Sequence, residues 1–117
     1  MEDTQLLKGI LEGCILAIIE EHETYGYDIL SQLQEYGFEN IIEGTLYPVL
    51  TRLNKKKLIS CRMGESPLGP KRKYYSITEE GIEWMKSFRE NYQKINISAQ
   101  KILFVFSVKL QYITWYL

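Results

Sequence analysis

Apolar and polar side chains alternate at helical spacing in residues 43–58, EGTLYPVLTRLNKKKL. Leu46, Val49 or Leu50, and Leu53 recur every three or four residues, which predicts one buried face of a helix. The outward face would carry hydroxyls and cations, the groups that meet phosphates and base edges in a DNA major groove. The alternative is an ordinary amphipathic helix with a solvated face. The outward residues that we expect to contact DNA are Tyr47, Thr51, Arg52 and Lys55.

Thr45 and Pro48 mark the predicted start of this helix. The Thr45 hydroxyl can accept a hydrogen bond from an early backbone N–H, which is the role of an N-cap residue. Pro48 would then occupy the third helical position. Its missing N–H costs nothing there, because the first turn has no intrahelical acceptor for it. Both residues would lie near the DNA backbone, at the start of the helix.

The length and composition fit one small folded domain of the cytoplasm. The chain has 117 residues, of which 25% are charged and 13% aromatic, and its apolar content suffices for a core. Cys14 and Cys61 are far apart in the sequence, which favours free thiols in a reducing compartment over a disulfide scaffold. The acidic Glu2 and Asp3 stand where a signal peptide would be basic, so we expect no export. With a single histidine, His22, we expect no metal site and no other cofactor.

Positive charge is concentrated in one segment, although the net charge of the chain is only −1. Residues 1–44 carry ten acidic side chains and one basic side chain, whereas residues 52–73 carry eight basic side chains and one acidic side chain. Such a patch attracts polyanions and makes their binding depend on salt. A run of charge can equally be a solvated face, so the patch indicates nucleic-acid binding only together with the elements around it.

Two predicted helices precede the polar-faced helix. In residues 4–21 apolar side chains recur at three- and four-residue spacing over a broad arc, so this helix should be deeply buried or shared between subunits. A second helix should cover residues 25–35, capped by Thr24 and closed by Gly37. Together with the polar-faced helix it matches a helix-turn-helix, whose second member presents polar groups.

A basic β-hairpin is predicted next. Residues 58–63 should form a strand, residues 64–70 a loop built from turn residues, and residues 71–77 the return strand. Attached to a helix-turn-helix, such a hairpin is a wing, which can follow a phosphate backbone or reach into a minor groove. Its cations suit either contact, and they are Lys71, Arg72 and Lys73.

Four segments carry a family resemblance: TYGYDI at 24–29, GTLYPVLTRL at 44–53, LI at 58–59 and KYYSITEEG at 73–81. In register over residues 5–95, they resemble the PadR family of bacterial winged-helix transcriptional regulators. The resemblance implies a homodimer that binds pseudo-palindromic operator DNA, usually as a repressor. It also implies release by an effector such as a phenolic acid or a hydrophobic drug. The short chain is similar to the small subfamily, which has a single C-terminal dimerisation helix.

A long C-terminal helix is expected after Thr78, its predicted N-cap. Glu79 and Glu80 would lie in the first turn, where the macrodipole favours acids. Apolar side chains then follow at alternating three- and four-residue steps, a coiled-coil-like seam that a dimer would bury. Packing of this seam on the first helix of the same chain is the alternative. The seam consists of Met85, Phe88, Tyr92, Ile95, Ala99, Ile102 and Phe106.

Tyr92 stands where an aromatic residue stacks on flat ligands between the subunits of some small-subfamily relatives. Tryptophan is common at that position, so the resemblance implies an aromatic face here, with an added hydroxyl that needs a partner. The first helix would form the other wall of the site, and interface packing is the alternative role. The predicted effector-binding residues are Leu7, Leu11, Ile15, Phe88 and Tyr92.

The tail, residues 102–117, departs from the family, whose members usually end in a charged helix. It is heavily apolar, but Lys109 and Gln111 interrupt it and it is too short for a convincing membrane span. Its β-branched and aromatic residues would suit a strand as well as a helix. We expect an extension of the dimer interface and no membrane partner, and the alternatives are a membrane-surface contact or a non-native end.

The sequence therefore predicts a mainly α fold with a small β-hairpin wing. Residues 1–77 would form a winged helix-turn-helix, and residues 78–117 a dimerisation helix with an apolar tail. The function favoured is a sequence-specific DNA-binding regulator, and the family resemblance implies a repressor released by a small hydrophobic or phenolic effector. A winged-helix module that binds protein instead of DNA would not need the basic residues of 52–73. The sequence shows no nucleophile–base pair, phosphate-cradling glycine loop or metal-ligand cluster, so we expect no enzyme.

Overall fold

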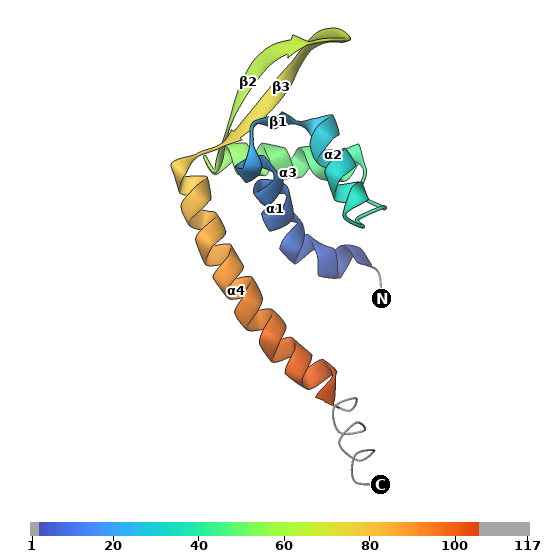
Figure 1. Cartoon of the computed structure of the whole chain (residues 1–117), viewed down its shortest axis with the longest axis vertical. Helices are drawn as coiled ribbons and strands as arrows, with labels where there is room; N and C mark the ends of the chain where they lie inside the picture. The colour runs from blue at the N-terminus through green and yellow to red at the C-terminus, as the bar shows by residue number, and fades with distance from the viewer. Residues whose placement is uncertain (1–2, 106–117) are drawn as a thin grey trace. The chain divides into compact units, whose positions relative to one another are not determined.

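Figure 1 shows a computed structural model of the chain, which describes residues 3–105. The predicted fold class, mainly α with a small wing, is confirmed. The chain divides into two compact units, Met1–Met85 and Lys86–Leu117, and each is described by itself. The elements follow in the order α1 (Asp3–Glu21), β1 (Thr24–Tyr25), α2 (Gly26–Glu35), α3 (Glu43–Lys55), β2 (Ile59–Ser66), β3 (Gly69–Ile77) and α4 (Glu79–Leu103).

The core of the first unit is built from the apolar faces of α1, α2 and α3. Burying one such aliphatic side chain stabilises a fold by about 1.5–3 kcal/mol, so the stripes seen in the sequence suffice to hold the three helices together. The broad apolar arc of α1 is buried over its second half, while Leu6 near its start is exposed. The fully buried side chains of the three helices are Ile15, Leu16, Ile19, Ile29, Leu33, Leu46, Leu50 and Leu53.

The start of α2 differs from the prediction, although its end does not. Tyr25, and not Thr24, is the N-cap, and no side chain caps the helix. The Thr24 hydroxyl donates to the carboxylate of Asp28 instead, because Thr24 already belongs to a strand. Gly37, with φ 116°, follows the helix in the left-handed region, which only glycine adopts at little cost.

The helix α3 begins three residues earlier than predicted, at Glu43, with Ile42 as its N-cap. Thr45 is therefore not the N-cap: its own N–H donates to the Ile42 carbonyl at 3.0 Å, inside the first turn. Pro48 lies inside the helix and not at its third position. It has no N–H for the carbonyl of Gly44, and both residues are exposed, so water can reach that carbonyl.

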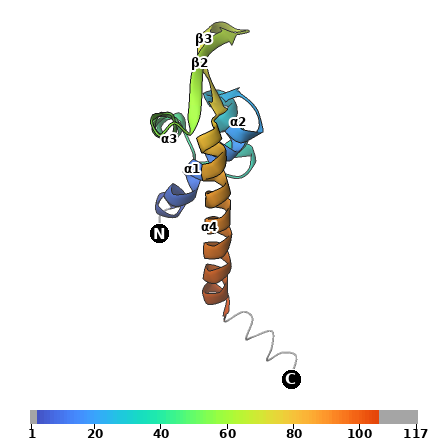
Figure 2. The same cartoon turned by 90° about the vertical axis from the view of Figure 1, so that its left-hand side faces the viewer.

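A third strand, β1, was not predicted. The sheet is antiparallel with the order β1-β3-β2. The strand β1 pairs Thr24 with Tyr75 and Tyr25 with Tyr74. It joins the hairpin to the connection between α1 and α2, and so attaches the wing to the helices. Beyond this attachment β2 and β3 project past α1, α2 and α3 in both views (Figures 1 and 2).

The hairpin is longer than predicted, and the expected loop at 64–70 is wrong. Only Pro67 and Leu68 remain between the two strands. Gly64 pairs with Arg72, and Ser66 pairs with Gly69. Between these two pairs β2 has one residue and β3 has two, one of which is Pro70. A bulge of this kind tolerates proline, which has no N–H for a ladder. Residues that favour turns are therefore accommodated within a strand.

Thr78 caps α4 as predicted. The Gly81 N–H donates to the Thr78 hydroxyl oxygen at 3.1 Å, and Glu79 and Glu80 occupy the first turn. The Thr78 hydroxyl in turn donates to the Lys57 carbonyl at 2.7 Å. The start of α4 is thereby fastened to the segment that joins α3 to β2.

The second unit contains the rest of α4. The rings of Phe88 and Tyr92 stack, with 6.1 Å between centroids and 19° between planes. Ile95 and Ile102 are exposed and Ala99 is half-buried. The predicted seam residue Phe106 and most of the apolar tail lie outside the described residues. Among residues 3–105, no helix is long and apolar enough to cross a membrane.

Candidate nucleic-acid interface

The outer face of α3 is exposed, as its periodicity predicted. Leu50 and Leu53 are 1% and 0% exposed on the inner face, which turns the polar residues of the same helix outward. Thr45 and Pro48 are exposed as well, in the first half of the helix. The exposed residues of the predicted DNA-contacting face are Tyr47, Thr51, Arg52 and Lys55.

Tyr47 also joins the two helices of the helix-turn-helix. A Cβ added to Gly26 would lie 2.7 Å from the Tyr47 hydroxyl oxygen, so the Tyr47 ring lies against the start of α2. The Thr51 hydroxyl donates to the Tyr47 carbonyl at 3.0 Å, one turn earlier in α3. The sequence predicted only the outward position of Tyr47, because its contact with α2 depends on how the helices pack.

The two cations at the end of α3 are open to a ligand. Within residues 3–105, neither Arg52 nor Lys55 makes an ion pair or a side-chain hydrogen bond. Their neighbour Lys56 differs, because its Nζ lies 3.1 Å from the Glu12 carboxylate. Arg52 could instead pair with a carboxylate and so hold the fold, but it has no such partner among the described residues.

The three predicted wing cations are held in different ways. Lys71 and Lys73 are exposed, and the Nζ of Lys71 lies 4.0 Å from the Glu65 carboxylate in a solvated pair. Arg72 is half-buried: its Cζ lies 3.5 Å from the Tyr25 ring centroid, and its Nε donates to the Tyr74 hydroxyl at 3.0 Å. From the sequence alone, the three cations were expected to have the same role.

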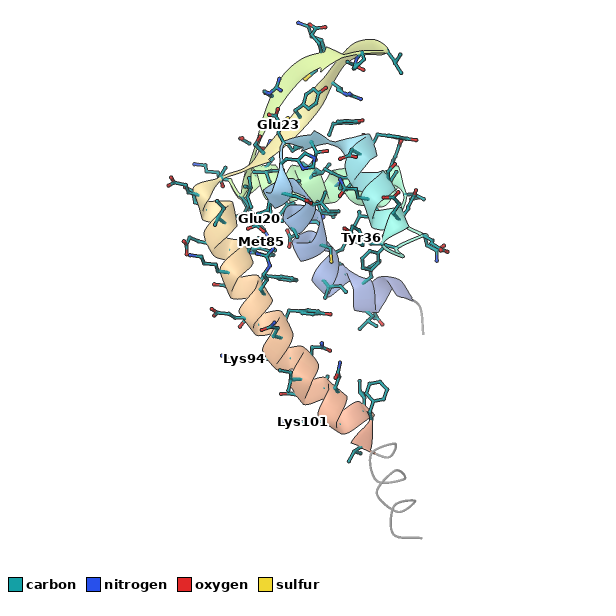
Figure 3. All side chains as sticks on the ribbon, in the orientation of Figure 1. Glu20, Glu23, Tyr36, Met85, Lys94 and Lys101 are labelled. Atoms are coloured by element: carbon teal, nitrogen blue, oxygen red, sulfur yellow. The ribbon has the colours of Figure 1, made fainter. Side chains whose placement is uncertain are left out.

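Arg62 and Glu23 form an ion pair that the sequence analysis did not single out. The Arg62 guanidinium donates to both carboxylate oxygens of Glu23, at 2.6 and 2.9 Å, and the Ser76 hydroxyl donates to the same carboxylate at 3.1 Å. Hydrogen bonding from Arg62, more than that from Ser76, lowers the pKa of Glu23. Glu23 lies at the base of the hairpin (Figure 3).

An open groove of about 900 Å³ runs along the first half of α1, the segment before α3 and the start of α3. Two of the predicted effector-binding residues, Leu7 and Leu11, line it. Ile15 does not, because it lies in the core and is 0% exposed. The other two, Phe88 and Tyr92, belong to the second unit.

Neither cysteine is part of a disulfide. Partial burial raises the pKa of the Cys14 thiol, which makes it less reactive. Among residues 3–105, no group of three or more histidines, cysteines and acids could hold a metal ion.

Comparisons with known proteins agree with this geometry. The family model "Transcriptional regulator PadR-like family" matches residues 15–87. A crystal structure of a PadR-like transcriptional regulator from Bacillus cereus is 44% identical, with a TM-score of 0.77, over 85% of this chain and 96% of that one. A Streptococcus transcriptional regulator is 43% identical, with a TM-score of 0.76, over 85% and 97%. An uncharacterised protein from Lysinibacillus sphaericus is 35% identical over 81% of this chain and 89% of its own length.

Proposed function

Since the chain belongs to the PadR-like family of transcriptional regulators, which are not enzymes, we propose that it represses transcription by binding operator DNA as a homodimer. The observation that carries the proposal is the exposed face of α3, on which Arg52 and Lys55 have no competing carboxylate within residues 3–105. Unpaired cations on a recognition-like helix are available for base edges and phosphates.

In this proposal α3 enters the major groove. Arg52 donates to a guanine, Tyr47 and Thr51 contact bases or sugars beside it, and Lys55 meets a phosphate. Thr45 and Pro48 approach the backbone from the first half of the helix, despite the earlier helix start. Lys71 and Lys73, exposed on the wing, contact phosphates of the flanking groove.

The dimer would use the apolar side of α4. Ile95 and Ile102 are exposed on this helix, and Phe88, Tyr92 and Ala99 fall at the same heptad-like spacing. Met85 is 1% exposed within its own chain, so it contributes less surface to a partner than the sequence alone implied. Two recognition helices held in this way would meet major grooves about 34–36 Å apart on a pseudo-palindromic operator.

An effector would act by binding the DNA-competent and incompetent dimers unequally. The stacked rings of Phe88 and Tyr92 offer a flat aromatic face. On α1, Leu7 offers apolar surface, whereas Leu11 lines the groove but is only 4% exposed. A small planar phenolic or hydrophobic molecule matches both surfaces in chemistry.

Fluorescence anisotropy with DNA from upstream of the chain's own coding sequence tests the proposal. A labelled operator fragment should bind at least about 10³-fold more tightly than a shuffled fragment of equal length. Equal binding of the two would contradict sequence-specific regulation, and no binding to either would favour a module that recognises protein. Transcription from the same promoter in vitro should fall as protein is added, and an increase would contradict repression.

A further inference from the structure

Two arginines and two tyrosines stack at the base of the wing. The Cζ of Arg72 lies 3.5 Å from the Tyr25 ring centroid and 5.4 Å from that of Tyr74. The Cζ of Arg62 lies 4.8 Å from the Tyr74 centroid. The two tyrosine rings meet edge to face, 5.8 Å apart at 72°. These four residues, called the wing stack below, come from all three strands.

The wing stack is anchored at both ends. Arg62 forms its two hydrogen bonds to Glu23, which follows α1. The Tyr74 hydroxyl accepts from Arg72 and donates to the Glu65 carbonyl at 2.8 Å, near the tip of the hairpin. Charged donors paired in this way make stronger hydrogen bonds than neutral ones. The stack therefore runs from the helices into the projecting part of the wing.

Gly64 makes room for the wing stack. A Cβ at this position would lie 2.6 Å from the Tyr74 ring and 2.7 Å from an Arg62 nitrogen. Any side chain at residue 64 would push the ring and the guanidinium apart. The strand β2 thus has a residue without a side chain where the stack crosses it.

The inner end of the hairpin is joined to the helices by β1, the one strand outside the hairpin that pairs with it among the described residues, and by the buried side chains of Ile59 and Tyr75. Farther out, the cations Lys71 and Lys73 lie on either side of Arg72 in β3. A projecting two-stranded hairpin is only marginally stable by itself, so contacts such as the stack matter there. Because the stack fixes the position of Arg72, it also fixes the positions of the flanking lysines.

We propose that the wing stack, anchored on Glu23, sets the angle of the wing, and that Arg72 is a positioning residue for DNA binding and not a phosphate contact. The proposal rests on the proposed function, since it concerns how the wing reaches DNA. Lysine can replace arginine as a cation at a phosphate, but it lacks the planar group that stacks on Tyr25 and the Nε that reaches Tyr74.

Operator affinity in a series of variants separates the two roles. Arg72→Lys and Tyr25→Leu should each weaken binding about tenfold, the scale of a lost cation–π contact, with an unchanged salt slope because no charge is lost. Tyr25→Phe keeps the ring and should bind as the wild type does. Lys71→Ala is the matched control and should lower the salt slope by about one unit. If the single variants Arg72→Lys and Tyr25→Leu both bound the operator with wild-type affinity, the proposal would be overturned.

The distance between the wing tip and α2 tests the proposal without DNA. Spin labels on cysteines at Leu68 and Tyr36, which are 99% and 80% exposed, report it in a background with Cys14→Ala and Cys61→Ser. Labelled chains are diluted with unlabelled ones so that only distances within a chain are measured. The distance distribution should be narrow in the wild type and Tyr25→Phe, and broad in Tyr25→Leu and Arg72→Lys.

Equal widths in all four proteins would overturn the proposal even if the wild type binds DNA. Absence of DNA binding by the wild type would instead overturn the proposed function, while the widths would still decide whether the stack holds the wing. Thermal unfolding of each variant identifies any that fails to fold, and Arg72→Lys and Tyr25→Leu report on the stack independently of each other.

Discussion

Gly81 lies directly against the backbone carbonyl of Leu58, so that a side chain at residue 81 would collide with that oxygen. The contact joins the first turn of α4 to the residue that leads from α3 into β2. Thr78 fastens the same place through the Lys57 carbonyl. The end of α3, the start of β2 and the start of α4 therefore meet at one point of backbone.

Replacing Gly81 with alanine should destabilise the fold by about 1–3 kcal/mol, the cost of forcing an extra group into a packed site. The carbonyl cannot move aside as the end of a flexible side chain could, so the backbone must shift. Gly9→Ala is the matched control, since a Cβ at residue 9 would meet nothing within 4 Å. In the helix α1 it should stabilise by about 0.5–1 kcal/mol. Urea unfolding of the two variants measures the contrast, and equal stabilities would contradict the packing argument.

Arg52→Ala should weaken operator binding by about 1–3 kcal/mol and relax base preference at one position of each half-site. Arg52 has no ion pair within the described residues, so two N–H groups of its guanidinium are available to donate to one guanine. Lys56→Ala is a neighbouring control, because Lys56 already pairs with Glu12 and should not read bases. Binding measured on a set of single-base operator variants gives the preference. An unchanged profile in folded Arg52→Ala would remove Arg52 from the interface.

Neutralising Lys73 should weaken binding to operator and shuffled DNA alike. A phosphate contact carries no base information, and its loss should reduce the slope of log affinity against log salt by about one unit. Titrations at several salt concentrations provide the slope. A changed base preference with the slope intact would mean that the wing reads a groove.

The helices of this fold could be predicted because each one marks its own buried face. Leu46, Leu50 and Leu53 recur with the helical period whatever they pack against, so the outward face of α3 follows from the sequence. The start of α4 was predicted from its cap, Thr78, but the starts of α2 and α3 could not be predicted in this way. Thr24 and Thr45 have the hydroxyls of a cap, yet the caps are Tyr25 and Ile42, whose extended backbone conformations leave no trace in the side-chain pattern.

The wing stack could not be predicted from the sequence, for a different reason. Tyr25 meets Tyr74 only through the register of β1 on β3, and Glu23 meets Arg62 across a long stretch of chain. A strand of two residues is too short to show an alternation of apolar and polar side chains, so the sequence does not indicate that β1 pairs with β3. The arginines were therefore counted as cations of one patch, although two of them are held by partners within the chain.

Acidification should weaken the anchor of the wing. The pKa of Glu23 is lowered, chiefly by its hydrogen bonds from Arg62, from an ordinary value of 4.5. A carboxyl whose pKa is lower in the folded state adds stability above its unfolded pKa and loses it as the pH falls through the folded value. The difference in unfolding free energy between the wild type and Glu23→Gln should therefore be present at neutral pH and shrink below pH 4.5. A difference that stays constant with pH would mean that the ion pair is not its source.

Tyr92→Ala should separate effector response from DNA binding. The Tyr92 ring is 45% exposed and stacks on Phe88, so its loss removes a flat face but none of the proposed DNA contacts. We expect operator affinity to stay close to that of the wild type, while release of DNA by planar aromatic ligands disappears. Tyrosine and tryptophan fluorescence of the wild type should change as such a ligand binds, and an unchanged signal would leave the rings a packing role only. Sedimentation equilibrium provides the control on assembly: a monomer at micromolar concentration would remove the dimer on which this response depends.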